Sequence, residues 1–195
     1  LVGSEMCIRD SLNRIPLSSS GFYKTNKINV NTKTLQGRPF LYFTYGAAVT
    51  EVIIDKLTGE NKILQVDIIH DVGNSINKRI DKGQIEGGYI QGLGWLTTEE
   101  VSWKSNGVLT THSPSTYKIP TAGETPFKFN VEIYDRGFNK EKVINRSKAV
   151  GEPPFMLAIS SFIALKDAVY NANKGKNSKN LIAPATAENI LKSLH

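Results

Sequence analysis

Residues 148–157, KAVGEPPFML, place one carboxylate, Glu152, between a glycine and two prolines at the start of an apolar run. A carboxylate in this setting can cap a helix, or it can act as a base if it is held near a transferable proton. Proline is tolerated in the first helical turn, which predicts a helix starting at about Pro153 or Pro154. The next eleven residues, FMLAISSFIAL, carry no charge and predict a helix buried on nearly every side. Glu152 is therefore expected in the interior or on its edge, as a cap or as a base.

A second polar candidate is Gln84, in a segment that predicts a helix from about Lys78 to Glu100. Gln91 follows about two turns later and lies on the same face. Each glycine inside a helix costs about 1 kcal/mol relative to alanine, and this segment has glycines at 83, 87, 88, 92 and 94. Close approach of another backbone or of a ligand would explain that cost. Two surface glutamines on an amphipathic helix explain the spacing of Gln84 and Gln91 equally well.

Several function classes are not expected from the composition. The three histidines, His70, His112 and His195, are far apart, and no CxxC or HxxxH spacing predicts a metal site. Cys7 is the only cysteine, so this chain alone holds neither a disulfide nor an iron–sulfur cluster. The net charge of +6 is scattered, which does not predict nucleic-acid binding. With no run of eighteen apolar residues, no membrane span is predicted.

Strands and helices are mixed without a regular βαβ alternation, which predicts an α+β fold with mixed sheet segments and two long buried helices. A hairpin with a loop containing Gly59 is expected from 41–55 and 63–73. Thr186 is expected to cap a last helix. The other expected elements are short strands at 99–104 and 107–111, an extended segment at 113–126, a strand at 127–135, and a helix from Pro153 to about Asn173.

The first eleven residues, LVGSEMCIRDS, lack the apolar centre of a signal peptide and show no periodicity. We interpret residues 1–11 as a foreign junction. The remaining residues, 12–195, are expected to be the C-terminal piece of a longer protein.

Six segments, in order along the chain, closely resemble the C-terminal part of the molybdenum-binding subunit or domain of xanthine dehydrogenases. The resemblance runs from about Leu17 to His195. The strings GQxEGxxxQGLG and KAVGEPP are specific to the wider xanthine oxidase family of molybdenum hydroxylases, and SGFY favours the xanthine dehydrogenase branch over aldehyde oxidases. The segments are SSSGFYKTN, YFTYGAAVTEV, DVGNSIN, GQIEGGYIQGLGWLTTEE, PSTYKIP and SKAVGEPPFMLAISSFIALKDAV.

Enzymes of this family hydroxylate a carbon of a heterocycle or aldehyde with oxygen from water, using a molybdopterin cofactor. The resemblance implies that Glu152 is the base that activates the molybdenum-bound hydroxyl. It also implies that Gln84 hydrogen-bonds the cofactor and that Gly151 lies beside it, with no metal ligand supplied by this chain. One departure is Lys78, which stands where family members usually have proline. The start of the glycine-bearing helix is therefore expected to differ slightly.

The resemblance further implies that 12–195 is an incomplete part of the molybdopterin-binding domain, inactive alone. The expected partners are the N-terminal remainder of that domain, 2Fe-2S and FAD modules, a second copy of the assembly, and a hypoxanthine- or xanthine-type purine in the cytoplasm. The family's purine-holding Glu and Arg belong to parts outside this segment, so these residues do not define the substrate. The alternatives are an aldehyde or other N-heterocycle hydroxylase, and a non-catalytic binding domain with the same fold.

Overall fold

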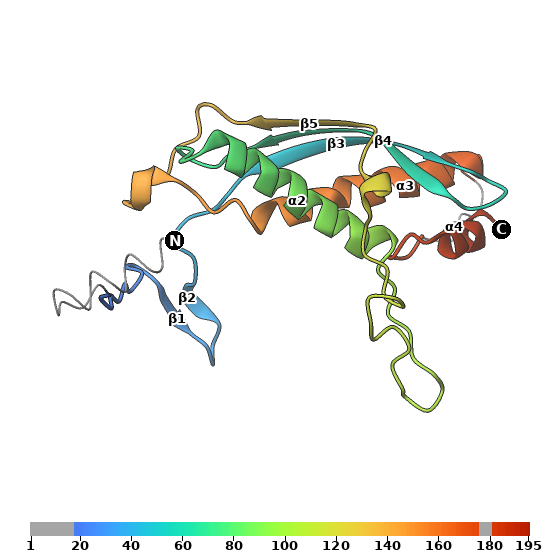
Figure 1. Cartoon of the computed structure of the whole chain (residues 1–195), viewed down its shortest axis with the longest axis horizontal. Helices are drawn as coiled ribbons and strands as arrows, with labels where there is room; N and C mark the ends of the chain where they lie inside the picture. Colours follow the sequence, from blue (N-terminus) through green and yellow to red (C-terminus); the bar gives the residue numbers. More distant parts are fainter. Residues whose placement is uncertain (1–17, 176–180) are drawn as a thin grey trace, which may run out of the picture. The chain divides into compact units, whose positions relative to one another are not determined.

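The computed structural model describes residues 18–175 and 181–195, so the segment 1–11 lies outside the described residues. The chain divides into two compact units, 1–41 and 42–195 (Figure 1). In the first unit, strands β1 (Asn29–Asn31) and β2 (Gln36–Arg38) form a small antiparallel hairpin. The Asn31 side chain accepts hydrogen bonds from the backbone of Lys33 and Thr34 in its turn. The sequence analysis did not predict this hairpin.

The second unit is built on a three-stranded mixed sheet in the order β3-β4-β5. Strands β3 (Gly46–Ile54) and β4 (Asn61–His70) form the predicted antiparallel hairpin, and Gly59 adopts a φ of +74° in its turn. Glycine takes this left-handed conformation without steric cost. Strand β5 (Lys128–Ile133) pairs with β4 in parallel. The α+β class predicted from the sequence is confirmed by this mixed arrangement.

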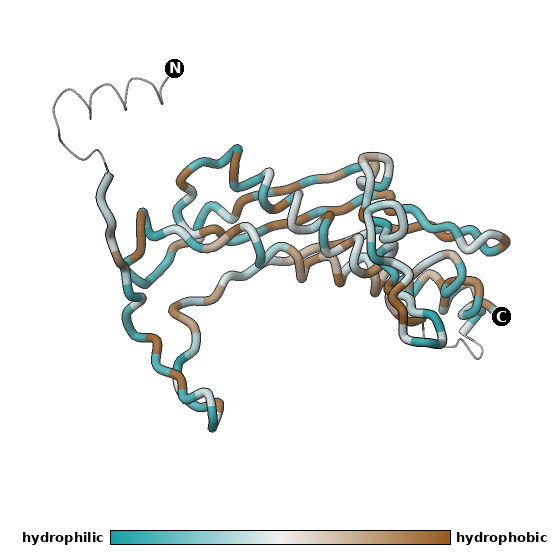
Figure 2. The backbone as a smooth tube through the Cα atoms, turned by 60° about the horizontal axis from the view of Figure 1, so that its bottom comes forward, coloured by the Kyte–Doolittle hydropathy of each residue, from teal (hydrophilic) through white to brown (hydrophobic). Residues whose placement is uncertain are grey.

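Helix α2 (Lys78–Thr97) makes the crossover that a parallel strand pair requires between β4 and β5. The Asn77 side chain caps it by accepting hydrogen bonds from the backbone of Arg79 and Ile80. The helix therefore begins at Lys78, as predicted, despite the missing proline. It packs on the sheet through a hydrophobic core. The backbone tube in Figure 2 shows hydrophobic and hydrophilic residues interspersed along the strands and helices. The core consists of Ile63, Val66, Ile68, Val72, Ile85, Tyr89, Leu93, Leu96, Val131 and Ala158.

The segment after Glu152 begins as a 3-10 helix, η3 (Pro153–Ala158), and continues as α3 (Ile159–Ala172). The start at Pro153 agrees with the prediction. Burial is one-sided among the described residues: Leu165 and Val169 are buried, whereas Met156, Ile163 and Tyr170 are about half exposed. The prediction that this helical segment is buried on nearly every side is therefore wrong for the described residues. Only one face of η3 and α3 packs against other described elements.

Helical residues Pro153–Ala172 are long and apolar enough to cross a membrane by length and composition, although the sequence analysis predicted no span. The difference arises because the helical segment formed by η3 and α3 is longer than the run of eleven uncharged residues within it. A single helix of this kind is weak evidence, since core helices of soluble proteins meet the same criterion.

A polar network explains why serines interrupt the apolar run. The Thr50 hydroxyl on β3 lies 2.7 Å from Ser160 Oγ and 3.3 Å from the Tyr89 hydroxyl. The Tyr89 hydroxyl also hydrogen-bonds Ser161 Oγ. Buried polar groups are stable when they are paired in this way. The network joins β3, α2 and α3 beneath the sheet.

Two further predictions had different outcomes. Helix α4 (Ala187–Leu194) forms as expected, with the Thr186 side chain accepting a hydrogen bond from the backbone of Asn189. The strands expected at 99–104 and 107–111 do not form: that hairpin has an isolated bridge between Trp103 and Leu109 and a few hydrogen bonds, such as Thr110 N–H to the Ser102 carbonyl. Its short length and exposed position leave it without the packed face that stabilises a strand.

Candidate active site

Glu152 is exposed and stands at the N-terminal end of η3. Its side chain makes no capping hydrogen bond, although its backbone carbonyl accepts one from the amide of Phe155 at 3.0 Å. The capping interpretation therefore has no geometric support. A carboxylate whose backbone is held, and whose side chain makes no capping hydrogen bond, can accept a proton from a ligand bound beside it.

Close packing between α2 and η3 contributes to the placement of Glu152. A Cβ built on Gly92 would lie 2.3 Å from the Phe155 carbonyl oxygen, and one built on Gly88 would lie 3.0 Å from the Gly151 carbonyl oxygen. The distance at Gly92 leaves no room for a side chain, and the distance at Gly88 is tight, so these two glycines provide the close backbone approach expected from the sequence. The Trp95 and Phe155 rings stack with their centres 5.3 Å apart and add to the contact between α2 and η3.

The same contact brings the two candidate polar residues together. Gln84 is exposed on α2, and its Oε1 lies 3.2 Å from a Cβ built on Gly151. Along this face of the helix, a Cβ on Gly83 or Gly87 would meet no described atom within 4 Å. Gln84, Gly151 and Glu152 thus border an open surface of α2, where a ligand can approach backbone closely.

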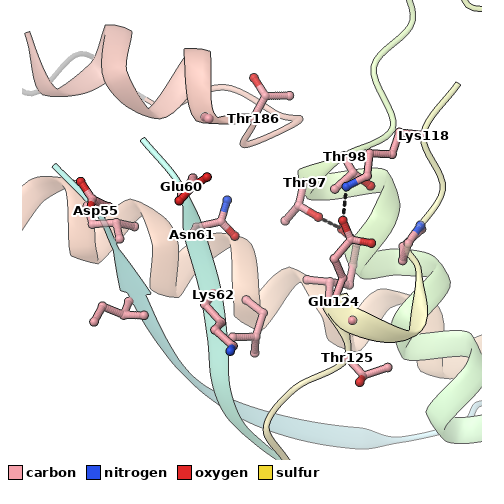
Figure 3. A pocket seen from close by; sticks show the side chains of 17 residues that line it. Asp55, Glu60, Asn61, Lys62, Thr97, Thr98, Lys118, Glu124, Thr125 and Thr186 are labelled. Atoms are coloured by element: carbon pink, nitrogen blue, oxygen red, sulfur yellow. Dashed lines mark hydrogen bonds and ion pairs between the residues drawn. The ribbon is translucent and has the colours of Figure 1, made fainter. Parts of the chain in front are cut away.

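Metal sites and cavities are the other features that could hold a ligand. Among residues 18–175 and 181–195, no group of three His, Cys, Asp or Glu side chains could hold a metal ion. A pocket of about 740 Å³ lies between the β3–β4 turn, the end of α2 and residues 118–125 (Figure 3). Its lining includes Lys62, Thr98 and Glu124 but neither Gln84 nor Glu152. This cavity and the candidate catalytic group are therefore separate features.

His70 ends β4 as a buried side chain, 2% exposed, and its Nδ1 has no partner among the described residues. Burial lowers the pKa of His70 below its ordinary value of 6.5; the Asp71 charge opposes this shift and the Lys148 charge adds to it. His70 is thus held in its neutral form.

The lowered pKa of His70 predicts acid sensitivity. The unfolded chain binds a proton near pH 6.5 that the folded chain resists, so the stabilisation is complete above that pH and is lost as the pH falls toward the folded pKa. His70→Gln should remove this slope. The check is the thermal midpoint of the full-length protein carrying this segment, compared with the variant between about pH 7.5 and pH 5.5. A constant difference between the two proteins would contradict the prediction.

Comparisons with known proteins show the family of the chain. A family model described as the molybdopterin cofactor-binding domain matches residues 3–126. The chain belongs to the molybdopterin cofactor-binding domain family. The chain is 48% identical over 185 residues to the xanthine dehydrogenase/oxidase of Felis catus, covering 92% of this chain and 14% of that protein. It is 45% identical over 197 residues to the xanthine dehydrogenase of Oryza sativa subsp. japonica, covering 96% and 14% respectively.

Solved structures show the same molybdopterin-binding fold. CO dehydrogenase from Oligotropha carboxidovorans superposes with a TM-score of 0.67 at 25% identity, over 77% of this chain and 18% of that one. Aldehyde oxidoreductase from Desulfovibrio gigas gives 0.64 at 25%, over 83% and 16%. The resemblance to xanthine dehydrogenases read from the motifs is confirmed. The chain spans about 14% of the length of the two dehydrogenases compared above.

The open face of α2 fits a molybdopterin ligand of this family. Gly83 and Gly87 leave space for a group to reach the helix backbone, and the Gln84 amide offers both a donor and an acceptor. The exposed carboxylate of Glu152 stands beside that space. The residues present can therefore border one side of such a cofactor.

The ion pair between Asp71 and Lys148 was not predicted from the sequence. Lys148 Nζ lies 2.5 Å from Asp71 Oδ2, and the two side chains are only 8% and 12% exposed. Both residues stand in the recognised motifs, DVGNSIN and SKAVGEPP. A charged residue at the end of a buried strand was the available signal, since buried charges are usually paired.

Gln84→Ala in the full-length enzyme should lower cofactor occupancy, activity or both. Leaving a buried polar partner unsatisfied typically costs about 1 to 3 kcal/mol, which corresponds to about tenfold to a hundredfold in affinity. The measurement is molybdenum per protein together with turnover. Gln91→Ala, on the same exposed helix face, is the matched comparison. Parent-level molybdenum and rate in Gln84→Ala would make Gln84 an ordinary surface residue.

Proposed function

We propose that this chain forms one wall of the active site of a xanthine dehydrogenase-like molybdenum hydroxylase acting on hypoxanthine- or xanthine-type purines. The observation that carries the proposal is the meeting of two distant motifs: the exposed Glu152 stands beside Gln84 and the open glycine face of α2. Molybdopterin, when bound, supplies the metal centre at which the substrate carbon is oxidised with oxygen from water.

Within that reaction, the Glu152 carboxylate accepts a proton from the oxygen nucleophile, which raises its reactivity toward the substrate carbon. Gln84 and Gly151 hold the cofactor edge, Gln84 through its side-chain amide and Gly151 by leaving room beside it. The backbone contacts of η3 keep the base in place, so little ordering is needed when the substrate binds.

The proposed assembly extends beyond this chain. An N-terminal remainder of the molybdenum domain would supply the opposite wall and the groups that hold the purine. Iron–sulfur and FAD modules would carry electrons away, in a dimeric cytoplasmic enzyme. The small share of its relatives' length that this chain spans supports this arrangement.

Purification of the full-length enzyme tests the proposal against its two alternatives. Bound molybdenum with xanthine turnover supports it. Bound molybdenum with aldehyde oxidation and no xanthine turnover would favour an aldehyde or other N-heterocycle hydroxylase. Absence of molybdenum from a folded protein would favour a non-catalytic binding domain.

The 195 residues expressed alone are expected neither to retain molybdopterin nor to oxidise xanthine. A ligand that keeps only one wall of its site loses most of its contacts, and each factor of ten in affinity needs only about 1.4 kcal/mol. Metal analysis of the purified chain checks this expectation. One molybdenum per chain would contradict it.

A further inference from the structure

Three segments meet behind the loop that carries Glu152. The Lys148 ammonium pairs with Asp71 at 2.5 Å and lies 5.0 Å from the centre of the Tyr45 ring. Asp71 also accepts a hydrogen bond at 2.8 Å from the backbone of Gly73. The entrance to β3, the end of β4 and the segment leading to Glu152 therefore meet at one charge cluster, whose two charged side chains are almost fully buried.

The backbone around this pair is joined as well. The Lys148 amide donates to the Val72 carbonyl at 2.8 Å, and Gly73 pairs with Ser147 in an isolated bridge. A Cβ built on Gly137 would lie 2.2 Å from Asp71 Oδ1, so glycine at that position makes room for the carboxylate. Asp71 is therefore closely packed against Gly137 and held by hydrogen bonds from Gly73 and Lys148.

From Lys148 to Glu152 every intervening residue is held. The Ala149 amide donates to the Tyr42 hydroxyl at 3.0 Å, Val150 packs on the core, and the Gly151 carbonyl approaches α2 at Gly88. These contacts leave the short segment 148–152 one conformation, in which the placement of Lys148 and that of Glu152 depend on each other.

A buried ion pair adds little net stability, because the free-energy cost of desolvating two charges offsets much of their attraction. It does define one relative placement of the segments that carry the charges. Resting on the proposed function, we propose that Asp71 and Lys148 are positioning residues for Glu152: their ion pair sets the register of 147–152 against the end of β4 and so sets the placement of the base.

The test uses the full-length enzyme with Lys148→Met and with the double variant Asp71→Asn/Lys148→Met. The single change leaves Asp71 charged and unpaired, whereas the double change removes both charges and so keeps a foldable comparison. Lys192→Met is the matched control, because it breaks an ion pair with Glu188 of the same 2.5 Å length whose side chains are 65% and 70% exposed.

Two quantities are measured on each protein: hydrogen exchange of the amides in 147–152, and the single-turnover reduction rate per bound molybdenum. We expect exchange in 147–152 to rise about tenfold or more in the double variant, and the rate to fall about tenfold to a hundredfold, since a displacement of about 1 Å can cost that much. Lys192→Met should match the parent in both.

Unchanged exchange in 147–152, or a rate per molybdenum within threefold of the parent (about 0.7 kcal/mol), would overturn the positioning role. If the double variant loses its cofactor, exchange is compared between cofactor-free forms, and equal exchange there overturns it as well. Failure of the proposed function would be recognised separately, as an undiminished rate in Glu152→Gln, whatever the exchange result.

Discussion

Glu152→Gln in the full-length enzyme is expected to lower the rate of molybdenum reduction by substrate about 10²- to 10⁴-fold, with the cofactor retained. Glutamine keeps the shape of the side chain and its hydrogen-bonding capacity but cannot take a proton at neutral pH. Glu152 makes no side-chain capping bond and is exposed, so the substitution removes no structural contact that the described residues provide. The loss should therefore appear in the rate and not in folding.

The measurement is a single-turnover reduction with molybdenum content determined on the same sample. Glu51→Gln is a suitable control, because Glu51 is an exposed carboxylate on β3. Retained cofactor with a rate within about tenfold of the parent would remove Glu152 from the catalytic role.

Gly92→Ala is expected to destabilise the domain and to reduce molybdenum occupancy. The new Cβ would lie 2.3 Å from the Phe155 carbonyl oxygen and 2.9 Å from the Ala158 Cβ, so α2 and η3 must separate. Overpacking of this kind costs about 1 to 3 kcal/mol and sometimes more, which exceeds the gain of about 1 kcal/mol from alanine's helix propensity. Separation of the two elements would also move Glu152 away from Gln84.

The thermal midpoint and the molybdenum content of the full-length enzyme measure the effect. Gly123→Ala provides the comparison, since a Cβ there would meet only Thr121 Oγ1 at 3.8 Å. A variant at position 92 that matches the Gly123→Ala protein in both quantities would show that α2 and η3 do not need their close approach.

Several local features could be predicted from the sequence because neighbouring residues determine them. The Gly59 turn, the Lys78 helix start and the Thr186 cap follow from short-range hydrogen bonds and backbone preferences. The start of η3 at Pro153 follows from proline geometry. The strands expected at 99–104 and 107–111 did not follow, because strand formation depends on packing that composition does not specify.

The one-sided burial of α3 shows a second limit. The uncharged run 155–165 predicted a helix buried all round, and the chain provides a packing partner for one face only. Hydropathy reports which side chains favour burial, but it does not report which other segment covers them.

By itself, the sequence determined the family, the residue types of the candidate site and the proposal that Glu152 is its base, because long motifs carry these directly. Only the tertiary structure decided that Glu152 has no capping role, that Gly88 and Gly92 place it next to Gln84, and that Asp71 pairs with Lys148. Those contacts join residues far apart in the chain. Their distances depend on how β4, α2 and η3 pack, and no local preference fixes that packing.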